Sequence, residues 1–513
     1  MKNLKRIVLF SPRPAANAFF DGVPIALLAV SRLLEKEGKY DIRIVTASGK
    51  EDYLKKVVGL AKGAVCLGIS SMTGYQIKDG LAVARAVKKK YPDLPIVWGG
   101  WHPTICPDQT MDSDLVDVVV RGGQGERTFY ELVHRLEQHR SLKGILGVSY
   151  KVRGKVFHNP DRPFEDINNF PPLPYHLIDV EKYVRASEYG SRTIDYVSSM
   201  GCPFRCSFCS EQLVNKRRWS GLPAERVIED LKHLNHQYQI NTVFFHDSNF
   251  FVDENRVREI CRGILKNKLD IKLGQLDART SQLVKYKKST WKLMKESGFV
   301  SMLVGAESGS RQVLEYIKKD AKFQDTIEMA KLCKKYEIAI VPSLMLGLPR
   351  FKGRFHQSLD MEYKQTISMI DKVIKTGVTC NIVGWFVYTP YPGTPLYDTS
   401  IQIGWKPPQT LEGWANLNLS EKNTSWITQK YVNLLTQLSV YIFPCMGTTY
   451  LGSWINRPKT NIRNTLLAIV IVPILKFLQQ TARLRWKYKF FSFPIETVLI
   501  KIYSDRVKKL NIV

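Results

Sequence analysis

Several common signals are missing from this 513-residue sequence. Its longest unbroken apolar stretch, Leu466 to Leu475, is too short to span a bilayer, and the early run Ile7–Phe10 is too short for a signal-peptide core. The nine cysteines are an odd number and lack the regular spacing of a disulfide framework. These absences favour a reducing compartment, so we expect a cytoplasmic protein.

A nucleotide-binding signature is also missing, because no Gly-x-Gly-x-x-Gly follows the first strand-like run. A nicotinamide or flavin dinucleotide is therefore disfavoured. What the chain has in excess is positive charge, with a formal net charge of +28. That charge suits nucleic acid, a membrane surface or anionic cofactors. It is spread along the chain without an added RNA-binding domain, so we expect no nucleic-acid partner, and an RNA-modifying protein stays as the alternative from another class.

The length predicts two or three domains. Over residues 1–140, short apolar runs alternate with amphipathic stretches, which is typical of a doubly wound, Rossmann-like α/β domain with a parallel sheet. The expected strands are Ile7–Phe10, Ile42–Thr46, Val65–Ser70, Ile96–Trp98 and Val118–Val120. Ligands of such folds bind at the carboxyl ends of the strands.

The loops at three of these strand ends carry small, hydroxyl or glycine residues. Glycine lets a backbone approach a ligand closely, so three such loops favour a large ligand over simple tight turns. The candidate binding residues in these loops are Ser70, Ser71, Thr73, Gly99, Gly100, His102, Gly122 and Glu126.

Residues 141–190 are predicted to connect two domains. Residues 146–158 alternate around Arg153-Gly154 as a β-hairpin does, and five prolines then fall within an extended connector over 159–190. Residues 191–400 contain six strand–helix units, which predicts a partial (βα)6 barrel of the TIM-barrel kind with its site at the carboxyl ends of the strands. The expected strands are Thr193–Ser198, Thr242–His246, Ile271–Leu276, Val300–Val304, Ala339–Met345 and Thr379–Val387.

A cysteine loop follows the first strand of this predicted barrel. Cys202, Cys206 and Cys209 are separated by three and then two residues. Soft thiolate ligands favour zinc or an iron–sulfur cluster. A structural zinc site needs four ligands, and the sequence offers no partner pair of cysteines. Three ligands leave one metal position open, which suits a [4Fe-4S] cluster with one iron free to bind another molecule.

These motifs resemble a known family. The segments GISSMT, VWGGWHPT and VVVRGGQGE are similar to the cobalamin-binding domain of cobalamin-dependent radical SAM enzymes, and the cysteine spacing matches the radical SAM signature. The resemblance implies three cofactors: a [4Fe-4S] cluster, S-adenosyl-L-methionine (SAM) and cobalamin. The Asp-x-His-x-x-Gly motif that ligates cobalt elsewhere is missing, which implies that His102 contacts the ligand's periphery or only backbone rather than cobalt.

The same resemblance assigns roles in the barrel. It places Phe208 beside the adenine of SAM, and Glu307 and Ser308, in a GxESGS-like loop, at its amino or ribose groups. In the alternative interpretation, Glu307 or Asp247 forms a structural ion pair with Arg279 or Arg311.

Residues 401–513 form a C-terminal, mostly helical region that is both basic and apolar. The segment 465–491 is typical either of a helix lying peripherally on an anionic membrane, here the inner face, or of a helix packed on the barrel.

The resemblance implies a methyltransferase that forms a 5′-deoxyadenosyl radical and methylates an unactivated carbon of a hydrophobic or anionic small molecule. An electron donor such as flavodoxin or ferredoxin is expected. An oxidative cyclase or rearrangement enzyme, resembling the anaerobic magnesium-protoporphyrin ester cyclase, and a non-catalytic cobalamin or iron–sulfur sensor remain as alternatives.

Overall fold

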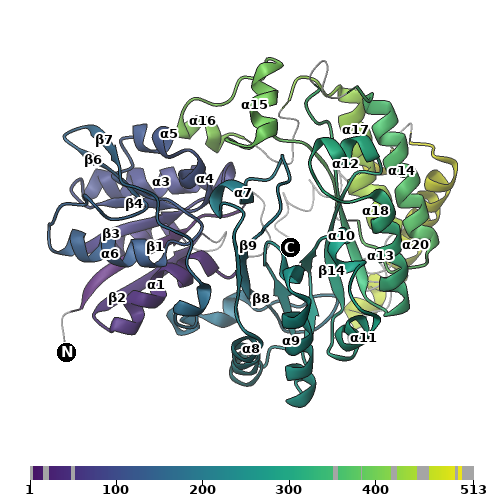
Figure 1. Cartoon of the computed structure of the whole chain (residues 1–513), viewed down its shortest axis with the longest axis horizontal. Helices are drawn as coiled ribbons and strands as arrows, with labels where there is room; N and C mark the ends of the chain where they lie inside the picture. Colours follow the sequence, from purple (N-terminus) through teal and green to yellow (C-terminus); the bar gives the residue numbers. More distant parts are fainter. Residues whose placement is uncertain are drawn as a thin grey trace.

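The computed structural model describes residues 4–14, 22–47, 52–350, 356–382, 384–417, 424–446, 462–491 and 495–498. Two α/β bodies lie side by side (Figure 1), an N-terminal sheet layered with helices and a curved barrel wall with helices outside it.

The N-terminal sheet has seven strands in the order β2-β1-β3-β4-β5-β6-β7. The first five run parallel, and β6 and β7 complete the edge antiparallel, as the predicted hairpin requires. The strands are β1 (Lys5–Ser11), β2 (Tyr40–Thr46), β3 (Ala64–Ser70), β4 (Ile96–Gly99), β5 (Val118–Val120), β6 (Val148–Val152) and β7 (Lys155–His158). The helices are α1 (Ile25–Glu37), α2 (Tyr53–Leu60), α3 (Tyr75–Lys90), α4 (Trp101–Ile105), α5 (Pro107–Asp112) and α6 (Glu126–Glu137).

Strand β1 shows why this sheet is covered on both faces. Side chains alternate along a strand, and all four residues Ile7–Phe10 are buried. Val8 and Phe10 belong to the core on one face, whereas Ile7 and Leu9 belong to the core on the other. The doubly wound architecture predicted from the continuous apolar run is confirmed.

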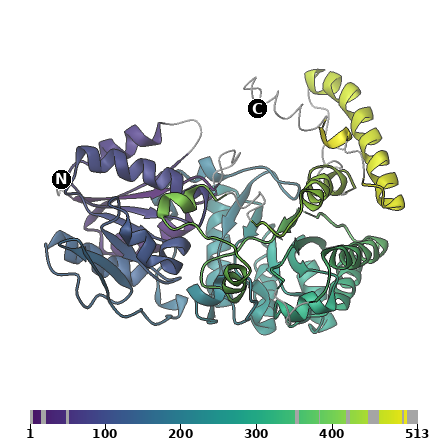
Figure 2. The same cartoon turned by 90° about the horizontal axis from the view of Figure 1, so that it is seen from above.

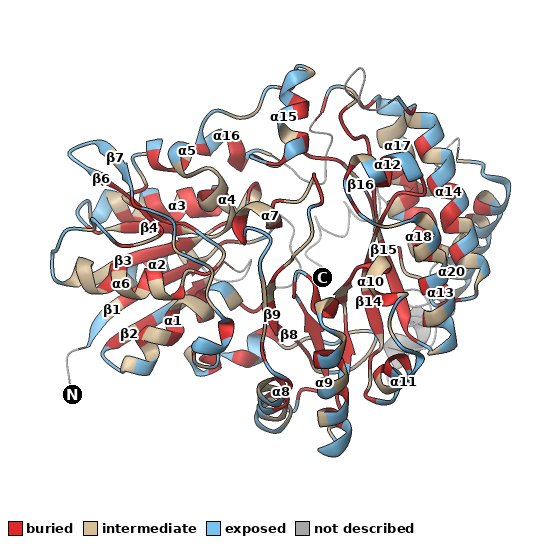
Figure 3. Cartoon of the chain, viewed as in Figure 1, coloured by how far each residue is buried: buried red, intermediate tan, exposed pale blue. Residues whose placement is uncertain are grey.

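Three short 3-10 turns connect the two bodies: η1 (Ile167–Asn169), η2 (Tyr175–Leu177) and η3 (Val180–Tyr183). The barrel wall then consists of two parallel sheets, β12-β11-β8 and β13-β14-β15-β16. Its strands are β8 (Thr193–Tyr196), β11 (Thr242–Phe245), β12 (Lys272–Gly274), β13 (Leu276–Ala278), β14 (Ser301–Glu307), β15 (Ala339–Leu346) and β16 (Gly384–Val387). Figure 3 shows these strands buried and the outer faces of the surrounding helices exposed.

The helices of the barrel are α7 (Glu211–Val214), α8 (Ala224–Tyr238), α9 (Glu254–Lys266), α10 (Thr280–Leu283), α11 (Lys288–Glu296), α12 (Arg311–Tyr316), α13 (Phe323–Lys335) and α14 (Leu359–Lys375), with the 3-10 turn η4 (Phe250–Val252). Two predicted strands need correction. The third is divided into β12 and β13 at Gln275, whose φ of 51° is incompatible with strand geometry, and the two parts join different sheets. The sixth begins only at Gly384, with a single bridge at Cys380 before it.

The chain beyond the barrel begins with α15 (Pro395–Gln402) and α16 (Leu411–Ala415). In the segment after residue 404, Trp405, Leu411 and Trp414 pack into the core of the N-terminal body. The Trp414 indole N–H donates to the side-chain oxygen of Gln109 at 2.7 Å. This segment therefore ties the end of the barrel back to the N-terminal sheet.

The last elements are α17 (Gln429–Gln437), the π-helical turn η5 (Leu438–Ile442), α18 (Phe443–Met446) and α20 (Ile462–Tyr488). In Figure 2, α20 lies at one end of the molecule and extends beyond the barrel. Among the described residues, no helix is long and apolar enough to cross a membrane. The predicted helical character of the C-terminal region is confirmed.

Candidate active site

The cysteine loop directly follows β9 (Ser199–Gly201), which pairs antiparallel with β10 (Trp219–Gly221). Gly201 has a φ of 89°, and a Cβ there would lie 2.1 Å from the carbonyl oxygen of Arg218, so only glycine fits. Inside the loop, the Gln212 side-chain amide donates to the carbonyl oxygens of Cys206 and Cys209 at 2.9 and 3.2 Å. These contacts hold the backbone of the loop without involving the three thiol groups.

One sulfur atom has a cationic neighbour. The Arg279 Nη1 donates to the Cys206 Sγ at 3.3 Å, and the guanidinium lies 3.8 Å from the centroid of the Phe204 ring. The second terminal nitrogen, Nη2, is buried and has no hydrogen-bond partner in the described structure. Arg279 follows β13 directly, so this strand of the barrel positions a buried positive charge next to the cysteine loop.

The other two thiols are protonated at neutral pH unless a metal binds. Burial raises the pKa of Cys209 to about 12 and raises the pKa of Cys202 as well. No group of three potential ligands in the described part of the chain is gathered close enough to hold a single metal ion. A cubane cluster instead offers a separate iron to each thiolate. Three sulfur atoms on one loop beside a buried cation fit such an anionic cluster.

Glu307 ends β14 with a φ of 58° and forms an ion pair with Lys319 at 2.7 Å. Both side chains are buried. Burial lowers the pKa of Lys319, but the neighbouring Glu307 carboxylate outweighs it and the net shift is upward. The Lys319 ammonium also lies 6.0 Å from the ring centroid of Phe208, so the pair is adjacent to the cysteine loop.

The ion-pair partners considered from the sequence are wrong. Glu307 pairs with Lys319, whereas Arg311 pairs with Glu315. Asp247 accepts hydrogen bonds from the Ser198 amide and from the hydroxyls of Ser198 and Ser199.

Ser308 is fully buried and its hydroxyl is engaged within the protein. It accepts from the Ser310 amide at 3.1 Å and lies 3.2 Å from the Thr366 hydroxyl. The hydroxyl therefore fixes the turn that follows Glu307.

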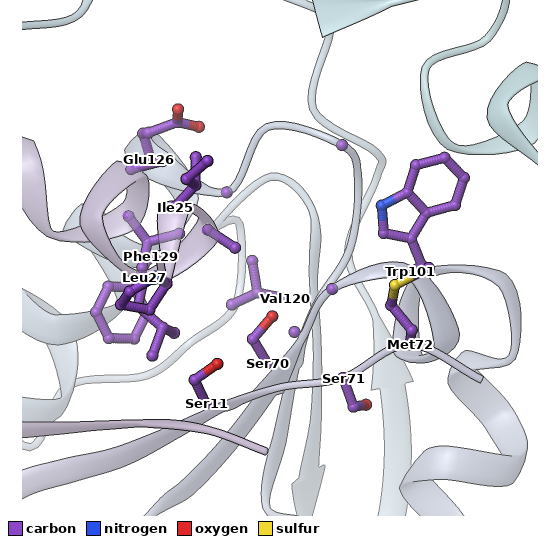
Figure 4. Close-up of a pocket in the computed structure, with 18 of the residues that line it drawn as sticks. Ser11, Ile25, Leu27, Ser70, Ser71, Met72, Trp101, Val120, Glu126 and Phe129 are labelled. Atoms are coloured by element: carbon purple, nitrogen blue, oxygen red, sulfur yellow. The ribbon is translucent and has the colours of Figure 1, made fainter. Parts of the chain in front are cut away.

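A cavity of about 410 Å³ lies at the carboxyl ends of β3, β4 and β5. Figure 4 shows Ser11, Ser70 and Ser71 near its floor, Met72 and Trp101 on one side, and Phe129 opposite. Gly100, with a φ of 96°, lines it, and a Cβ there would lie 2.7 Å from the Ser71 carbonyl oxygen. The buried Ser71 hydroxyl has no partner among described residues. The glycine backbone, the apolar walls and a hydroxyl that is available for a further hydrogen bond are suited to a large, partly polar cofactor.

The cavity contains six of the eight residues predicted for these loops: Ser70, Ser71, Gly99, Gly100, Gly122 and Glu126. The Glu126 carboxylate is buried and receives a hydrogen bond from Arg32 at 2.5 Å. Thr73 and His102 do not line the cavity. They bond to each other at 3.1 Å behind the loop, and the His102 ring lies 5.7 Å from that of Trp414.

The environment of His102 is apolar. It is fully buried, and burial lowers its pKa to about 4, so the imidazole is neutral at physiological pH. Its Nε2 has no partner among the described residues. The structure places this ring in the packing between α4 and the segment that carries Trp414.

The barrel contributes its own residues to the same cavity. Ser199, Met200, His246 and Ser248 line it together with the N-terminal loops. His246 was missed as a site residue, although it comes directly after β11, at the end of the barrel where function is expected. Its Nε2 lies 2.9 Å from the Asp195 carboxylate.

The Asp195 carboxylate also accepts two hydrogen bonds from Arg185, at 3.0 and 2.5 Å. Burial lowers the pKa of His246, but Asp195 outweighs it and the net shift is upward. Asp277 is close enough to favour the protonated imidazole further, and burial raises the pKa of Asp277 to about 7. The Asp195 carboxylate therefore favours the protonated form of His246, whose half-exposed ring lines the cavity that both bodies share.

Comparisons with known proteins agree with this arrangement. The family model described as B12 binding domain matches residues 14–133, and the one described as Radical SAM superfamily matches residues 196–360. The chain contains a B12-binding domain followed by a radical SAM domain. The predicted order of the two α/β parts is confirmed, and so is the assignment to an enzyme class that uses SAM and cobalamin.

Relatives of this radical SAM protein include several methyltransferases. It is 29% identical to uncharacterized methyltransferase PH0819 of Pyrococcus horikoshii, covering 86% of this chain and 95% of that protein. It is 24% identical to hopanoid C-3 methylase of Methylococcus capsulatus (76% and 71% covered). It is 23% identical to the anaerobic magnesium-protoporphyrin IX monomethyl ester cyclase of Rubrivivax gelatinosus (68% and 60% covered).

Two solved structures share the fold of this radical SAM protein. The cobalamin-dependent SAM radical enzyme OxsB, with aqua-cobalamin and SAM bound, has a TM-score of 0.72 at 18% identity, covering 99% of this chain and 76% of that one. The radical SAM methyltransferase TsrM of Kitasatospora setae, with cobalamin and a [4Fe-4S] cluster bound, has a TM-score of 0.61 at 17% identity, covering 78% and 76%.

Proposed function

We propose that this enzyme is a cobalamin-dependent radical SAM C-methyltransferase. Its substrate is a small hydrophobic or anionic molecule with an unactivated carbon that receives the methyl group. The observation that carries the proposal is the shared cavity, which both the N-terminal loops and the ends of β9 and β11 line. A cofactor in the N-terminal loops therefore faces the mouth of the barrel, where the cysteine loop begins.

We assign the residues that would hold the cofactors from their places in the fold. Cys202, Cys206 and Cys209 bind the cluster, while Glu307 and Phe208 lie on the barrel side where SAM binds. The loops from Ser70, Gly99 and Gly122 cradle cobalamin. Bound there, the cluster would supply the electron for reductive cleavage of SAM, and cobalamin would supply the methyl group for transfer.

The protein's own residues orient the reactants and exclude water. Glu307 presents a carboxylate suited to the SAM amino group, and its ion pair with the buried Lys319 fixes the position of that carboxylate. His246, whose protonated form Asp195 favours, is suited to an anionic substrate group in the shared cavity. The segment with Trp405 and Trp414 closes the N-terminal loops from behind.

The proposal extends to domain boundaries and partners. The cobalamin domain spans residues 1–140, the linker 141–190, the barrel 191–400 and the C-terminal region 401–513. Reductive cleavage of SAM needs an external electron donor, for which a flavodoxin or ferredoxin is suited. The basic surface expected from a net charge of +28 favours such acidic partners.

Isotope-labelled SAM tests the proposal. Anaerobically reconstituted protein, incubated with a reductant, cobalamin, cell extract and methyl-deuterated SAM, is expected to form 5′-deoxyadenosine and one product carrying the intact labelled methyl group. The Cys206→Ala variant is expected to form neither. A wild-type protein that binds a cluster but no corrinoid, or that leaves the label in SAM and methionine alone, would refute methyl transfer.

The relation to magnesium-protoporphyrin cyclases supports one further candidate, oxidative cyclisation. The same experiment separates the two reactions. A cyclase consumes SAM to 5′-deoxyadenosine and yields a product that has lost hydrogen and gained no labelled carbon. A methyltransferase yields a product one methylene unit heavier, apart from the isotope.

A further inference from the structure

Helix α20 has three distinct faces along its described part. One face packs on the molecule through Leu478, Ala482 and Trp486, which belong to the core shared with η5 and α18. The Trp486 indole N–H donates to an Asp371 carboxylate oxygen at 3.2 Å, and the Tyr441 hydroxyl donates to the Leu478 carbonyl oxygen at 3.3 Å. This face accounts for the docking of the helix on the barrel.

A second face is apolar and exposed. Ile474, Phe477, Leu484 and Tyr488 are 53%, 61%, 54% and 69% accessible to solvent. Their spacing of three, seven and four residues places them in one stripe of an α-helix. Ile495 and Val498, just beyond the helix, are also exposed, at 63% and 51%. An exposed apolar stripe of this kind on a helix marks an interaction site.

A third face flanks this stripe with positive charge. Lys476, Arg483 and Lys487 are exposed and, at spacings of seven and four residues, share one side of the helix next to the stripe. Residues 462–491 contain six lysine and arginine residues and no aspartate or glutamate. The helix therefore combines an apolar stripe with a basic flank, which is the pattern of helices that lie in a membrane interface.

The positive surface continues onto the barrel. A groove of about 510 Å³ between α13 and α14 is lined by five lysines: Lys331, Lys334, Lys335, Lys372 and Lys375. Asp371 joins the two regions, because it binds Lys375 at 2.9 Å and Lys489 of the α20 end at 3.3 Å. The lysines of this groove therefore add to the positive charge close to the docked end of α20.

We propose that α20 docks this enzyme on an anionic phospholipid surface, with the stripe from Ile474 to Tyr488 inserted at the level of the headgroups. Charge complementarity favours an anionic bilayer over a second copy of the chain as the partner of this stripe. A second copy placed symmetrically on the stripe would bring two basic flanks together, whereas an anionic bilayer neutralises them. The proposal is independent of the methyl-transfer chemistry, so either can fail without the other.

Vesicle sedimentation with the full-length protein tests the docking. Vesicles of phosphatidylcholine with about one third phosphatidylglycerol are expected to bind the protein, and neutral phosphatidylcholine vesicles to bind it at least tenfold more weakly. Raising the salt from about 0.1 M to 0.5 M is expected to release it, because exposed charges are then screened. Equal binding to both vesicles, or none to either, overturns the proposal.

Variants locate the contact. The triple change Lys476→Gln, Arg483→Gln and Lys487→Gln is expected to weaken binding roughly a hundredfold, since each cation near an anionic membrane contributes about a fivefold factor. Phe477→Ser is expected to weaken it about tenfold or more. Leu265→Ser, a matched exposed apolar change on α9, is expected to have no effect.

Unchanged binding in both the triple variant and Phe477→Ser overturns the assignment to α20. A concentration-dependent dimer without vesicles that Phe477→Ser abolishes also overturns it, because a second copy then covers the stripe. Circular dichroism of each variant separates loss of contact from loss of fold, and the comparison of the two vesicle types needs no variant.

Discussion

Replacing Arg279 by methionine tests whether the barrel adjusts the electron chemistry of the cysteine loop. In the structure, the Arg279 guanidinium donates to the Cys206 sulfur at 3.3 Å from a buried position. A positive charge there stabilises a reduced, more negative cluster over an oxidised one. Removing it should therefore lower the reduction potential of the cluster.

The size of that change follows from two estimates. A hydrogen bond to a charged group contributes about 1.5–3 kcal/mol, and if about 1 kcal/mol of it differs between the redox states, the potential falls by about 40 mV. The Coulomb energy between the guanidinium and one added electron about 6 Å away is about 2.8 kcal/mol at an effective dielectric constant of about 20, or roughly 120 mV. We expect a decrease between these values.

The assay is a redox titration of the reconstituted protein without SAM, followed by the electron paramagnetic resonance of the reduced cluster. Arg279→Lys, which keeps the charge, should shift the potential less than Arg279→Met. Arg311→Met is the matched control, because Arg311 is exposed and pairs only with Glu315 in the described structure. A potential for Arg279→Met within about 15 mV of wild type, well under the shift expected from one lost charge, would refute the reasoning if iron content is unchanged.

Three further predictions concern the remaining groups. Glu307→Gln leaves the buried Lys319 ammonium without its ion-pair partner, so it should lower the free energy of unfolding by about 3–5 kcal/mol and weaken SAM binding at least tenfold in calorimetry. The double variant Glu307→Gln with Lys319→Met should regain stability but not SAM affinity. Restored SAM affinity would contradict the assignment of Glu307 to SAM. Gly100→Val should abolish corrinoid binding in absorption spectra and leave the cluster intact, whereas Gly144→Ala, at a similar positive φ in open space, should bind corrinoid normally. The pKa of His246 is raised in the folded state, so its contribution to stability is full below about pH 6.5 and is lost as the pH rises through the folded pKa. Urea titrations should therefore show that the free energy of unfolding of the wild type decreases across that range, whereas that of His246→Gln does not. Identical pH profiles for the two proteins would show that the His246 charge does not stabilise the fold.

Much of the fold can be predicted from local sequence. Continuous apolar runs such as Ile7–Phe10 indicate strands that are buried on both faces, and the strand before Cys202 places the cysteine loop at the mouth of a barrel. Both patterns depend on residues close in sequence. Gln275 shows the limit, because nothing in its neighbourhood signals the left-handed conformation that divides the third strand.

Contacts between distant residues could not be predicted in the same way. Lys319 follows Glu307 by twelve residues and belongs to no motif, so its ion pair becomes visible only when α12 folds back on β14. The position of His102 in a loop at a strand end predicts a contact with the ligand. Its ring instead packs against Trp414, which lies more than three hundred residues further along the chain. His246 carried a positional signal after β11, yet only Asp195 explains its charge.

In the proposed mechanism, the cobalamin and cluster positions face one cavity. The most direct test is the electron spin relaxation of cob(II)alamin in protein loaded with both cobalamin and the reduced cluster. We expect reduction of the cluster to accelerate this relaxation through spin–spin coupling, and we expect no acceleration in Cys206→Ala protein, which retains cobalamin. Identical relaxation with the cluster oxidised and reduced, in fully loaded wild-type protein, would contradict it.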